Sequence, residues 1–234
     1  MEHNIPNSET DLDAKTIVFN SLAREYDLWF EAEGKLIFEI EIRAFQEIIP
    51  LLPSPWLEIG VGSGRFARAL GIQTGVDPSS ELLKIAKSRG IDTYLSSGEE
   101  CPLQDGSFGS VFIIVTLCFV DSPELVLQEA HRILAPGGNV VLGLVLRESP
   151  WGIFYEQKKI AGHRFYQYAN FYSYNEVVTL LTQSGFSVSK VVSTLFQKPH
   201  LVKDMEFPRE GYDPDAGFTI ITASKKQPDN ETNL

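Results

Sequence analysis

Apolar and polar positions follow two patterns along the chain. From about residue 14 to residue 49 the pattern is helical, because isoleucines and alanines recur at three- and four-residue steps. The segment PLLPSP over 50–55 then ends the helix, since proline cannot continue one. We therefore expect N-terminal helices over residues 13–52.

Beyond residue 55, short apolar runs alternate with helical stretches that mostly begin near serine or proline and end near glycine. The apolar runs predict strands in WLEIG, QTGVDPS, IDTYLSS, SVFIIVTLCFV, NVVLGLVL, VSKVVSTLFQ and AGFTIITASK. Such alternation implies an α/β fold with helices on both faces of a doubly wound, seven-stranded, mostly parallel sheet. The last two strands have no helix between them. We expect them to form an antiparallel pair, joined by a long loop over 197–217 at the carboxyl end of the sheet, where ligands bind in open α/β folds.

Three glycines stand between the first predicted strand and the helix after it. In WLEIGVGSGRF, Glu58 is followed by Gly60, Gly62 and Gly64. Glycine here allows a tight turn and lets a ligand approach the backbone, and the N-terminus of the next helix favours a carboxylate or phosphate. A nicotinamide-binding loop would read G-x-G-x-x-G, but Arg65 stands in place of the last glycine. The spacing therefore disfavours a nicotinamide oxidoreductase.

The spacing E-x-G-x-G-x-G resembles the cofactor loop of the class I S-adenosylmethionine-dependent methyltransferases. The resemblance covers roughly residues 18–190 and is closest to the type 11 methyltransferases, whose acceptors are diverse. The segment YDLWF, 26–30, resembles an element that precedes the first strand in ubiquinone- and menaquinone-type methyltransferases. The resemblance implies a Rossmann-like sheet, S-adenosylmethionine as cofactor with S-adenosylhomocysteine as product, and methyl transfer to a small-molecule acceptor.

The resemblance assigns cofactor-binding roles to residues at the ends of the first four predicted strands. Asp77 ends the second strand and can accept both ribose hydroxyls, although it could instead cap the next helix. Ser97 stands where the family usually has an acid, ahead of residues that lie along the adenine edge. Tyr26 either lies over the cofactor or anchors a buried helix. The expected set is Tyr26, Glu58, Gly60, Val61, Gly62, Gly64, Asp77, Pro78, Ser97, Gly98, Glu99, Thr116 and Leu117.

An aromatic segment over 147–175 follows the fifth predicted strand, where class I methyltransferases insert caps that bind the acceptor. Within it we expect Tyr155, Tyr166 and Tyr172 to contact the acceptor, unless the cap simply packs on its own aromatic rings. Cys118, at the end of the fourth strand, is a further candidate or else a small buried apolar residue.

Methyl transfer needs a general base only where the acceptor must lose a proton. The candidates are His163, His200 and Asp27, and each histidine has the alternative of being a hydrogen-bonded surface residue. The sequence assigns no catalytic residue beyond these.

Composition narrows the partners. Apolar residues make up 43% of the 234-residue chain, charged residues 22%, and the formal net charge is −11. These values suit one domain over 13–225 with flexible ends at 1–12 and 226–234. The acidic balance disfavours nucleic acid as a partner, because nucleic acid attracts Lys and Arg patches.

No apolar run approaches the roughly 20 residues that span a bilayer, and the polar N-terminus lacks signal-peptide features. We therefore expect a cytoplasmic monomer or homodimer without membrane insertion. Two cysteines give no metal-site spacing, so no metal is expected. A non-catalytic regulatory or partner protein that binds S-adenosylmethionine would carry the same motifs and stays an alternative.

Overall fold

The computed structural model describes residues 13–226. The terminus predicted to be flexible, 1–12, and nearly all of the predicted tail, 226–234, lie outside the described residues. Strands within 13–226 form one sheet in the order β3-β2-β1-β4-β5-β8-β6-β7. They are β1 (Trp56–Ile59), β2 (Thr74–Asp77), β3 (Asp92–Leu95), β4 (Phe108–Ile114), β5 (Leu134–Leu144), β6 (Phe186–Thr194), β7 (Arg209–Glu210) and β8 (Phe218–Lys225).

The direction of the strands confirms the predicted topology. Strands β1 to β5 run parallel to their neighbours in the sheet, whereas β8 is antiparallel to both β5 and β6. The long loop between β6 and β8 contains β7, which pairs with β6 in the antiparallel sense. The sequence pattern does not predict β7, because two residues are too few to show a period.

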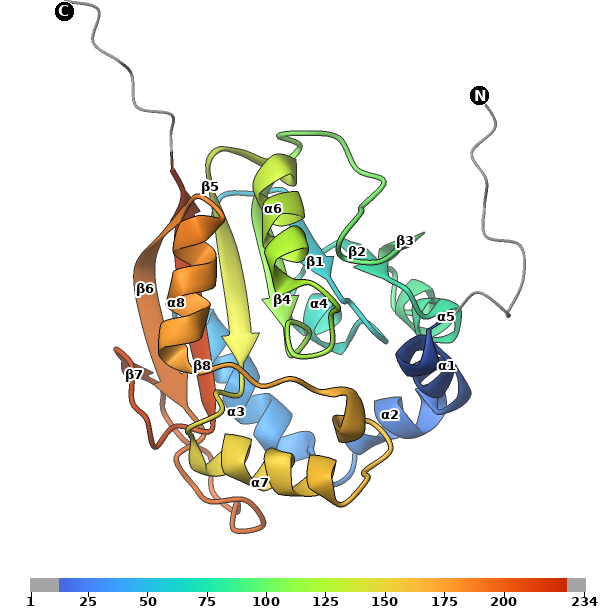
Figure 1. Cartoon of the computed structure of the whole chain (residues 1–234), viewed down its shortest axis with the longest axis vertical. Helices are drawn as coiled ribbons and strands as arrows, with labels where there is room; N and C mark the ends of the chain where they lie inside the picture. Colours follow the sequence, from blue (N-terminus) through green and yellow to red (C-terminus); the bar gives the residue numbers. More distant parts are fainter. Residues whose placement is uncertain (1–12, 227–234) are drawn as a thin grey trace, which may run out of the picture.

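Helices cover both faces of the sheet and its carboxyl end. They are α1 (Ala14–Ser21), α2 (Ala23–Trp29), α3 (Lys35–Gln46), α4 (Arg65–Leu70), α5 (Ser80–Ser88), α6 (Pro123–Ile133), α7 (Pro150–Ile160) and α8 (Tyr174–Gln183), with short 3₁₀ turns η2 (Ile49–Leu51) and η3 (Tyr166–Tyr168). Figure 1 shows α6 and α8 in front of the sheet and α3 and α4 behind it, while α1, α2 and α7 lie beyond the carboxyl ends of the strands.

Serines determine where four of these helices begin. The hydroxyls of Ser79, Ser122, Ser149 and Ser173 each accept the backbone N–H three residues later, at the starts of α5, α6, α7 and α8. These caps satisfy N–H groups that no carbonyl of the helix can reach. The boundaries that bring the loops to the carboxyl end are therefore written locally in the sequence.

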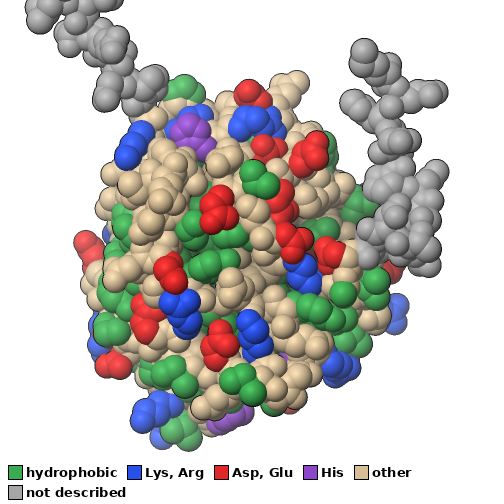
Figure 2. All heavy atoms as spheres, viewed as in Figure 1, with side chains coloured by type: hydrophobic (Ala, Val, Ile, Leu, Met, Phe, Trp, Pro, Cys, Tyr) green, Lys and Arg blue, Asp and Glu red, His purple; other side chains and the backbone are tan. Residues whose placement is uncertain are grey.

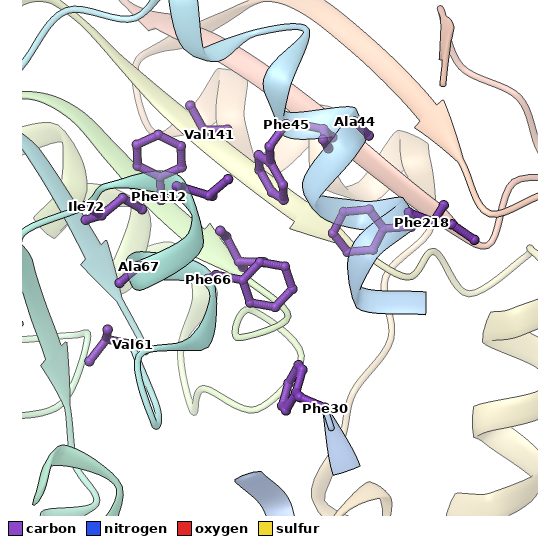
Figure 3. Packing of buried hydrophobic residues seen from close by; sticks show 14 of the residues in the cluster. Phe30, Ala44, Phe45, Val61, Phe66, Ala67, Ile72, Phe112, Val141 and Phe218 are labelled. Carbon is purple, nitrogen blue, oxygen red and sulfur yellow. The ribbon is translucent and has the colours of Figure 1, made fainter. Parts of the chain in front are cut away.

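Phe45 holds α3 against the sheet. Its ring centroid lies 6.1 Å from that of Phe66, 6.4 Å from that of Phe112 and 6.0 Å from that of Phe218, which belong to α4, β4 and β8. Figure 3 shows these rings facing one another. Because β8 begins beside the end of β5, Phe45 sits near the carboxyl end of the parallel strands. The preceding turn of α3 therefore extends toward the loops at that end.

One face of the molecule shows a mixture of charges. Acidic and basic side chains are interspersed on the face shown in Figure 2, and no large basic patch gathers there. From residue 13 to residue 226, no helix combines the length and the apolar character needed to cross a membrane. The same residues include no group of three or more His, Cys, Asp or Glu arranged to hold a metal ion.

Candidate active site

The glycine loop between β1 and α4 is held closely against its neighbours. The N–H groups of Gly60 and Val61 both donate to the carbonyl of Val76, at 2.8 and 3.0 Å. Gly60 has a φ of +77°, and a Cβ built on it would lie 2.2 Å from the side chain of Thr116. Glycine is therefore required at position 60 by both its backbone conformation and the space available.

Gly62 lies at the tip of the loop and faces open space. A Cβ built on it would come near only the ring of Tyr26, at 3.8 Å. The N–H of Gly62 donates to one carboxyl oxygen of Asp77 at 2.8 Å, and the other oxygen accepts the N–H of Ser79 at 2.8 Å. Ser79, and not Asp77, is the N-cap of α5. The carboxyl of Asp77 links the glycine loop to the start of that helix.

Two buried acids stand side by side beneath this loop. Asp77 is 7% exposed, and burial raises its pKa to about 6 against the pull of its two backbone hydrogen bonds. Burial also raises the pKa of Glu58 well above its usual value, and the charge of Asp77 adds to the effect. One carboxyl oxygen of Glu58 has no hydrogen-bond partner within residues 13–226. A positive charge placed at the loop would stabilise the ionised form of both acids.

A cleft opens above the loop, with about 840 Å³ of empty space when its solvent-filled mouth is included. This volume is within the range typical of small-molecule sites. Most of the predicted cofactor residues line it: Tyr26, Gly60, Gly62, Asp77, Pro78, Ser97, Gly98, Glu99 and Thr116. The structure therefore brings together, on one wall, residues drawn from the ends of β1, β2, β3 and β4.

The remaining cofactor candidates do not line the cleft. Glu58, Val61 and Leu117 are buried below its floor. Gly64 stands at the N-cap of α4 with a φ of +77°, where a Cβ would lie 3.1 Å from Ala86. These positions support the loop from beneath.

Helix α1 forms a wall of the cleft that the sequence does not predict. Asp13, Lys15, Thr16 and Phe19 line this wall. The ammonium group of Lys15 donates to the carbonyl of Phe119 at 3.0 Å and pairs with Asp121 at 2.5 Å. No local pattern links Lys15 with residues more than one hundred positions away, so only the fold reveals this contact.

Val115, directly after β4, has an unusual backbone conformation. It lines the cleft with a φ of +50°, in the left-handed region that β-branched residues rarely adopt. Such strain is typical of functional sites, where the surrounding structure over-determines the backbone.

The acceptor candidates lie outside the cleft and divide into two groups. Tyr155 and Tyr166 belong to one aromatic core with ring centroids 4.3 Å apart, whereas Tyr172 packs against the core on the other face of the sheet. Cys118 is 8% exposed and belongs to the first core, and its carbonyl accepts the N–H of Asn170 at 2.7 Å. That bond attaches the cap to the loop after β4.

The candidate bases are also outside the cleft. His200 is exposed and packs on the ring of Phe154, with centroids 4.7 Å apart. Burial lowers the pKa of His163, and its Nδ1 accepts N–H groups of its own turn at 3.4 and 3.5 Å. Asp27 pairs with Arg65 and Arg89. Although burial opposes them, hydrogen bonds from these arginines hold the pKa of Asp27 well below its usual range, which makes it a poor base.

One buried acid was missed by the sequence interpretation. Glu41 lies on the buried face of α3 with Ile40, Ala44 and Phe45, and is 6% exposed. The signal was present, because Glu41 falls among the apolar positions at helical spacing.

Comparison with known proteins identifies the family. The family model described as "Methyltransferase domain" matches residues 57–142, from β1 into β5. An uncharacterised protein of Methanocaldococcus jannaschii is 40% identical over 89% of this chain and 98% of its own. A crystal structure from Thermotoga maritima, described as an "SAM-dependent methyltransferase, possible histamine N-methyltransferase", is 39% identical with a TM-score of 0.84 and covers 91% of this chain and 100% of that one. The chain belongs to the S-adenosylmethionine-dependent methyltransferases.

A ubiquinone/menaquinone biosynthesis C-methyltransferase of Rubrivivax gelatinosus is a more distant relative of this methyltransferase, 29% identical over 52% of each chain. The predicted family, fold and cofactor are thereby confirmed. The cofactor supplies a methyl group on a positively charged sulfur. A cleft whose glycine-lined turn is bonded to the buried carboxyl of Asp77, with Glu58 as a second buried acid, fits such a group.

Proposed function

We propose that this methyltransferase transfers the methyl group of S-adenosylmethionine to a small-molecule acceptor that enters from the side of the aromatic cap. The observation that carries the proposal is the burial of the cap over the carboxyl end of the sheet. Trp151, Tyr155 and Phe171 are 3, 8 and 4% exposed. An acceptor that reaches the cleft past these buried rings would be small, since small-molecule sites bury most of their ligand among apolar and aromatic side chains.

The residues of the cleft have distinct roles in this proposal. The carboxyl of Asp77 holds the ribose hydroxyls, the bare backbone at Gly62 allows close approach, and Ser97 with Gly98 and Glu99 border the adenine. Support comes from their common position in one cleft and from the hydrogen bond between Gly62 and Asp77. The aromatic ring of Tyr26 lies where the cleft meets the cap, because it also packs against Phe165 with centroids 5.7 Å apart.

Alignment is what the protein contributes to the reaction. The leaving group is a neutral thioether, so little charge must be stabilised, and holding the two reactants in line can supply up to ~7–11 kcal/mol. The rigid loop at Gly60 and the strained backbone at Val115 suit that task, since both fix the floor of the cleft.

The test compares thermal unfolding with S-adenosylmethionine, S-adenosylhomocysteine and NAD. A ligand at one hundred times its dissociation constant stabilises the folded state by ~2.7 kcal/mol, which raises Tm by roughly 5–10 °C for a chain of this size. We expect that shift with the first two ligands only. A shift with NAD alone would contradict the cofactor assignment.

Acceptor use is then measured as methyl transfer from methyl-labelled S-adenosylmethionine. Histamine is the first acceptor to assay, because the description of the Thermotoga maritima relative names it. Binding of S-adenosylhomocysteine without transfer to any small molecule would favour the non-catalytic alternative.

A further inference from the structure

The carboxyl of Glu41 is buried without a partner. Its side chain is 6% exposed, yet it takes part in no hydrogen bond or ion pair with any residue that the structure describes. Burial alone raises its pKa to about 8. An uncompensated buried carboxyl is unfavourable, and such groups are uncommon outside functional sites.

Two tyrosine side chains on other helices lie within electrostatic reach of Glu41, and a third packs against one of them. Tyr155 on α7 and Tyr26 on α2 both lie within reach of its charge, which contributes to the raised pKa values of their hydroxyls, after the larger effect of burial. Tyr166 on η3 lies against Tyr155, with ring centroids 4.3 Å apart. Figure 1 shows α2, α3 and α7 surrounding the region beyond the carboxyl ends of β4 and β5. We call Glu41, Tyr26, Tyr155 and Tyr166 the acid–tyrosine cluster.

Tyr26 connects this cluster to the cofactor cleft. Its ring lines the cleft, and the pKa of its hydroxyl, raised above all by burial, also responds to Asp77 and Glu58 below the glycine loop and to Glu41 on α3. The cluster therefore borders the cofactor cleft at the end that faces the cap. In the proposed function, the acceptor enters the cleft from this end.

No lysine or arginine among the described residues pairs with Glu41. Lys158 lies above the rings of Phe154, Tyr155 and Tyr166, at 4.7, 5.9 and 5.8 Å from their centroids, but it does not pair with Glu41. The ammonium group of Lys159 is taken by the carbonyl of Ala169 at 2.5 Å. A buried carboxyl that lacks a basic partner among the described residues is complementary to a bound cation.

We infer that the acid–tyrosine cluster is the acceptor subsite and that the acceptor is a small protonated amine whose ammonium group pairs with Glu41. This inference rests on the proposed methyl transfer and names the class of acceptor. The tyrosine rings add cation–π attraction and exclude water, so the pair forms in a desolvated site.

The same carboxylate also prepares the amine for reaction. Binding of the ammonium group releases the proton of Glu41 to solvent, and the resulting carboxylate takes a proton from the ammonium nitrogen, which leaves a neutral amine with a free electron pair. That pair forms the new nitrogen–carbon bond, while the carbon–sulfur bond breaks and its electrons stay on sulfur. The proton remains on the Glu41 carboxyl until it passes to solvent. A pKa raised to about 8 suits this transfer, because it lies closer to that of an alkyl ammonium group, near 10, than an ordinary glutamate does.

The experiment uses the full chain with Glu41→Gln, which keeps the size of the side chain and removes its charge. The matched control is Glu39→Gln, an exposed position on the same helix. Each protein receives methyl-labelled S-adenosylmethionine and sets of acceptors of equal shape, such as 2-phenylethylamine, 2-phenylethanol and 3-phenylpropionate, together with the corresponding imidazole and alkyl series. Binding of S-adenosylhomocysteine is measured in parallel by calorimetry.

We expect amines alone to be methylated, with kcat/KM reduced at least ~100-fold in Glu41→Gln and unchanged in Glu39→Gln. Methylation of the alcohols or carboxylates in preference, or of no amine while S-adenosylhomocysteine still binds, would overturn the amine assignment. Full activity of Glu41→Gln would overturn the role of Glu41. If the wild-type protein does not bind S-adenosylhomocysteine at all, the proposed function itself is contradicted.

A second variant guards against a folding defect. Tyr166→Phe keeps the ring and removes only the hydroxyl, so it should raise KM for the amine a few-fold and leave the affinity for S-adenosylhomocysteine unchanged. An equal effect on both ligands would contradict the placement of the acceptor beside Tyr166.

Discussion

Asp77 and Glu41 are both buried carboxyls within electrostatic reach of Tyr26, yet the protein treats them differently. Asp77 has a backbone N–H donor for each oxygen, and burial raises its pKa only to about 6. Glu41 has no donor within residues 13–226, and the pKa rises to about 8. The difference is the one expected when hydrogen bonds to the charged form oppose desolvation.

The comparison separates a site that is built in advance from one that awaits its ligand. The side of the cleft formed by the glycine loop and the start of α5, which we call the cofactor wall, is fixed by backbone hydrogen bonds. The acid–tyrosine cluster is made of side chains on separate helices and leaves its carboxyl without a partner among residues 13–226. Four predictions test this division, beginning with the largest effect.

Gly60→Ala should disrupt the cofactor wall most strongly. A Cβ would collide with Thr116, and alanine is strained at the φ of +77° that this position adopts. We therefore expect a loss of roughly 3–5 kcal/mol in the free energy of unfolding and no cofactor binding. Gly90→Ala is the matched control: it has a φ of +84° with no atom within 4 Å, and should lose only about 1–2 kcal/mol. Denaturant unfolding measures both, and equal losses would contradict the steric argument.

Glu41→Gln should change how stability depends on pH. Because the pKa of Glu41 is raised in the folded chain, that chain holds more protons than the unfolded chain between about pH 4.5 and pH 8. The stability of the wild-type protein should therefore fall as pH rises through this window, by up to about 4 kcal/mol from this group. Glu41→Gln should remove that fall, and Glu39→Gln should not. Denaturant unfolding at pH 5 and at pH 8 measures this change in the wild type and in Glu41→Gln. An equal change in both proteins would contradict the unpaired state of Glu41.

Asp77→Asn should weaken binding of the cofactor and, because the amide nitrogen cannot accept one of the two backbone N–H groups, should also lower the free energy of unfolding by about 1–3 kcal/mol. The change removes a charged acceptor, which we expect to reduce the affinity for S-adenosylhomocysteine by ~10–150-fold, equivalent to about 1.5–3 kcal/mol. The Tm shift at a fixed, near-saturating ligand concentration reports the loss. Asp92→Asn, exposed on β3, should keep the full shift, and a normal shift in Asp77→Asn would contradict the ribose-binding role.

Lys15→Ala should have the smallest effect. The pair with Asp121 lies at the surface, and such pairs contribute ~0.2–1 kcal/mol, so affinity for S-adenosylhomocysteine should fall no more than about five-fold. Calorimetry with Lys35→Ala as the exposed control measures this. A loss of a hundred-fold or more would mean that α1 controls access to the cleft.

The sequence predicted the cofactor wall far better than the acceptor side, and the reason is local. Glycine spacing, the acid at the end of β2 and serine caps are patterns over a few residues, so the strands, the topology and most of the cleft follow from them. The ion pair between Lys15 and Asp121 joins segments that are far apart in the chain, so no local sequence pattern predicts it. Glu41 left a weak one, a single acid on the apolar face of a helix. Tyr172 was grouped with Tyr155 and Tyr166 by composition, although it packs on the other face of the sheet.

The most direct test of this division is a calorimetric titration of S-adenosylhomocysteine into the wild-type protein, Asp77→Asn and Glu41→Gln. We predict that Glu41→Gln binds it within about two-fold of wild type while Asp77→Asn binds at least ~10-fold more weakly. Equal weakening of both variants would contradict the account, since it would place Glu41 in the cofactor site and remove the separate acceptor subsite.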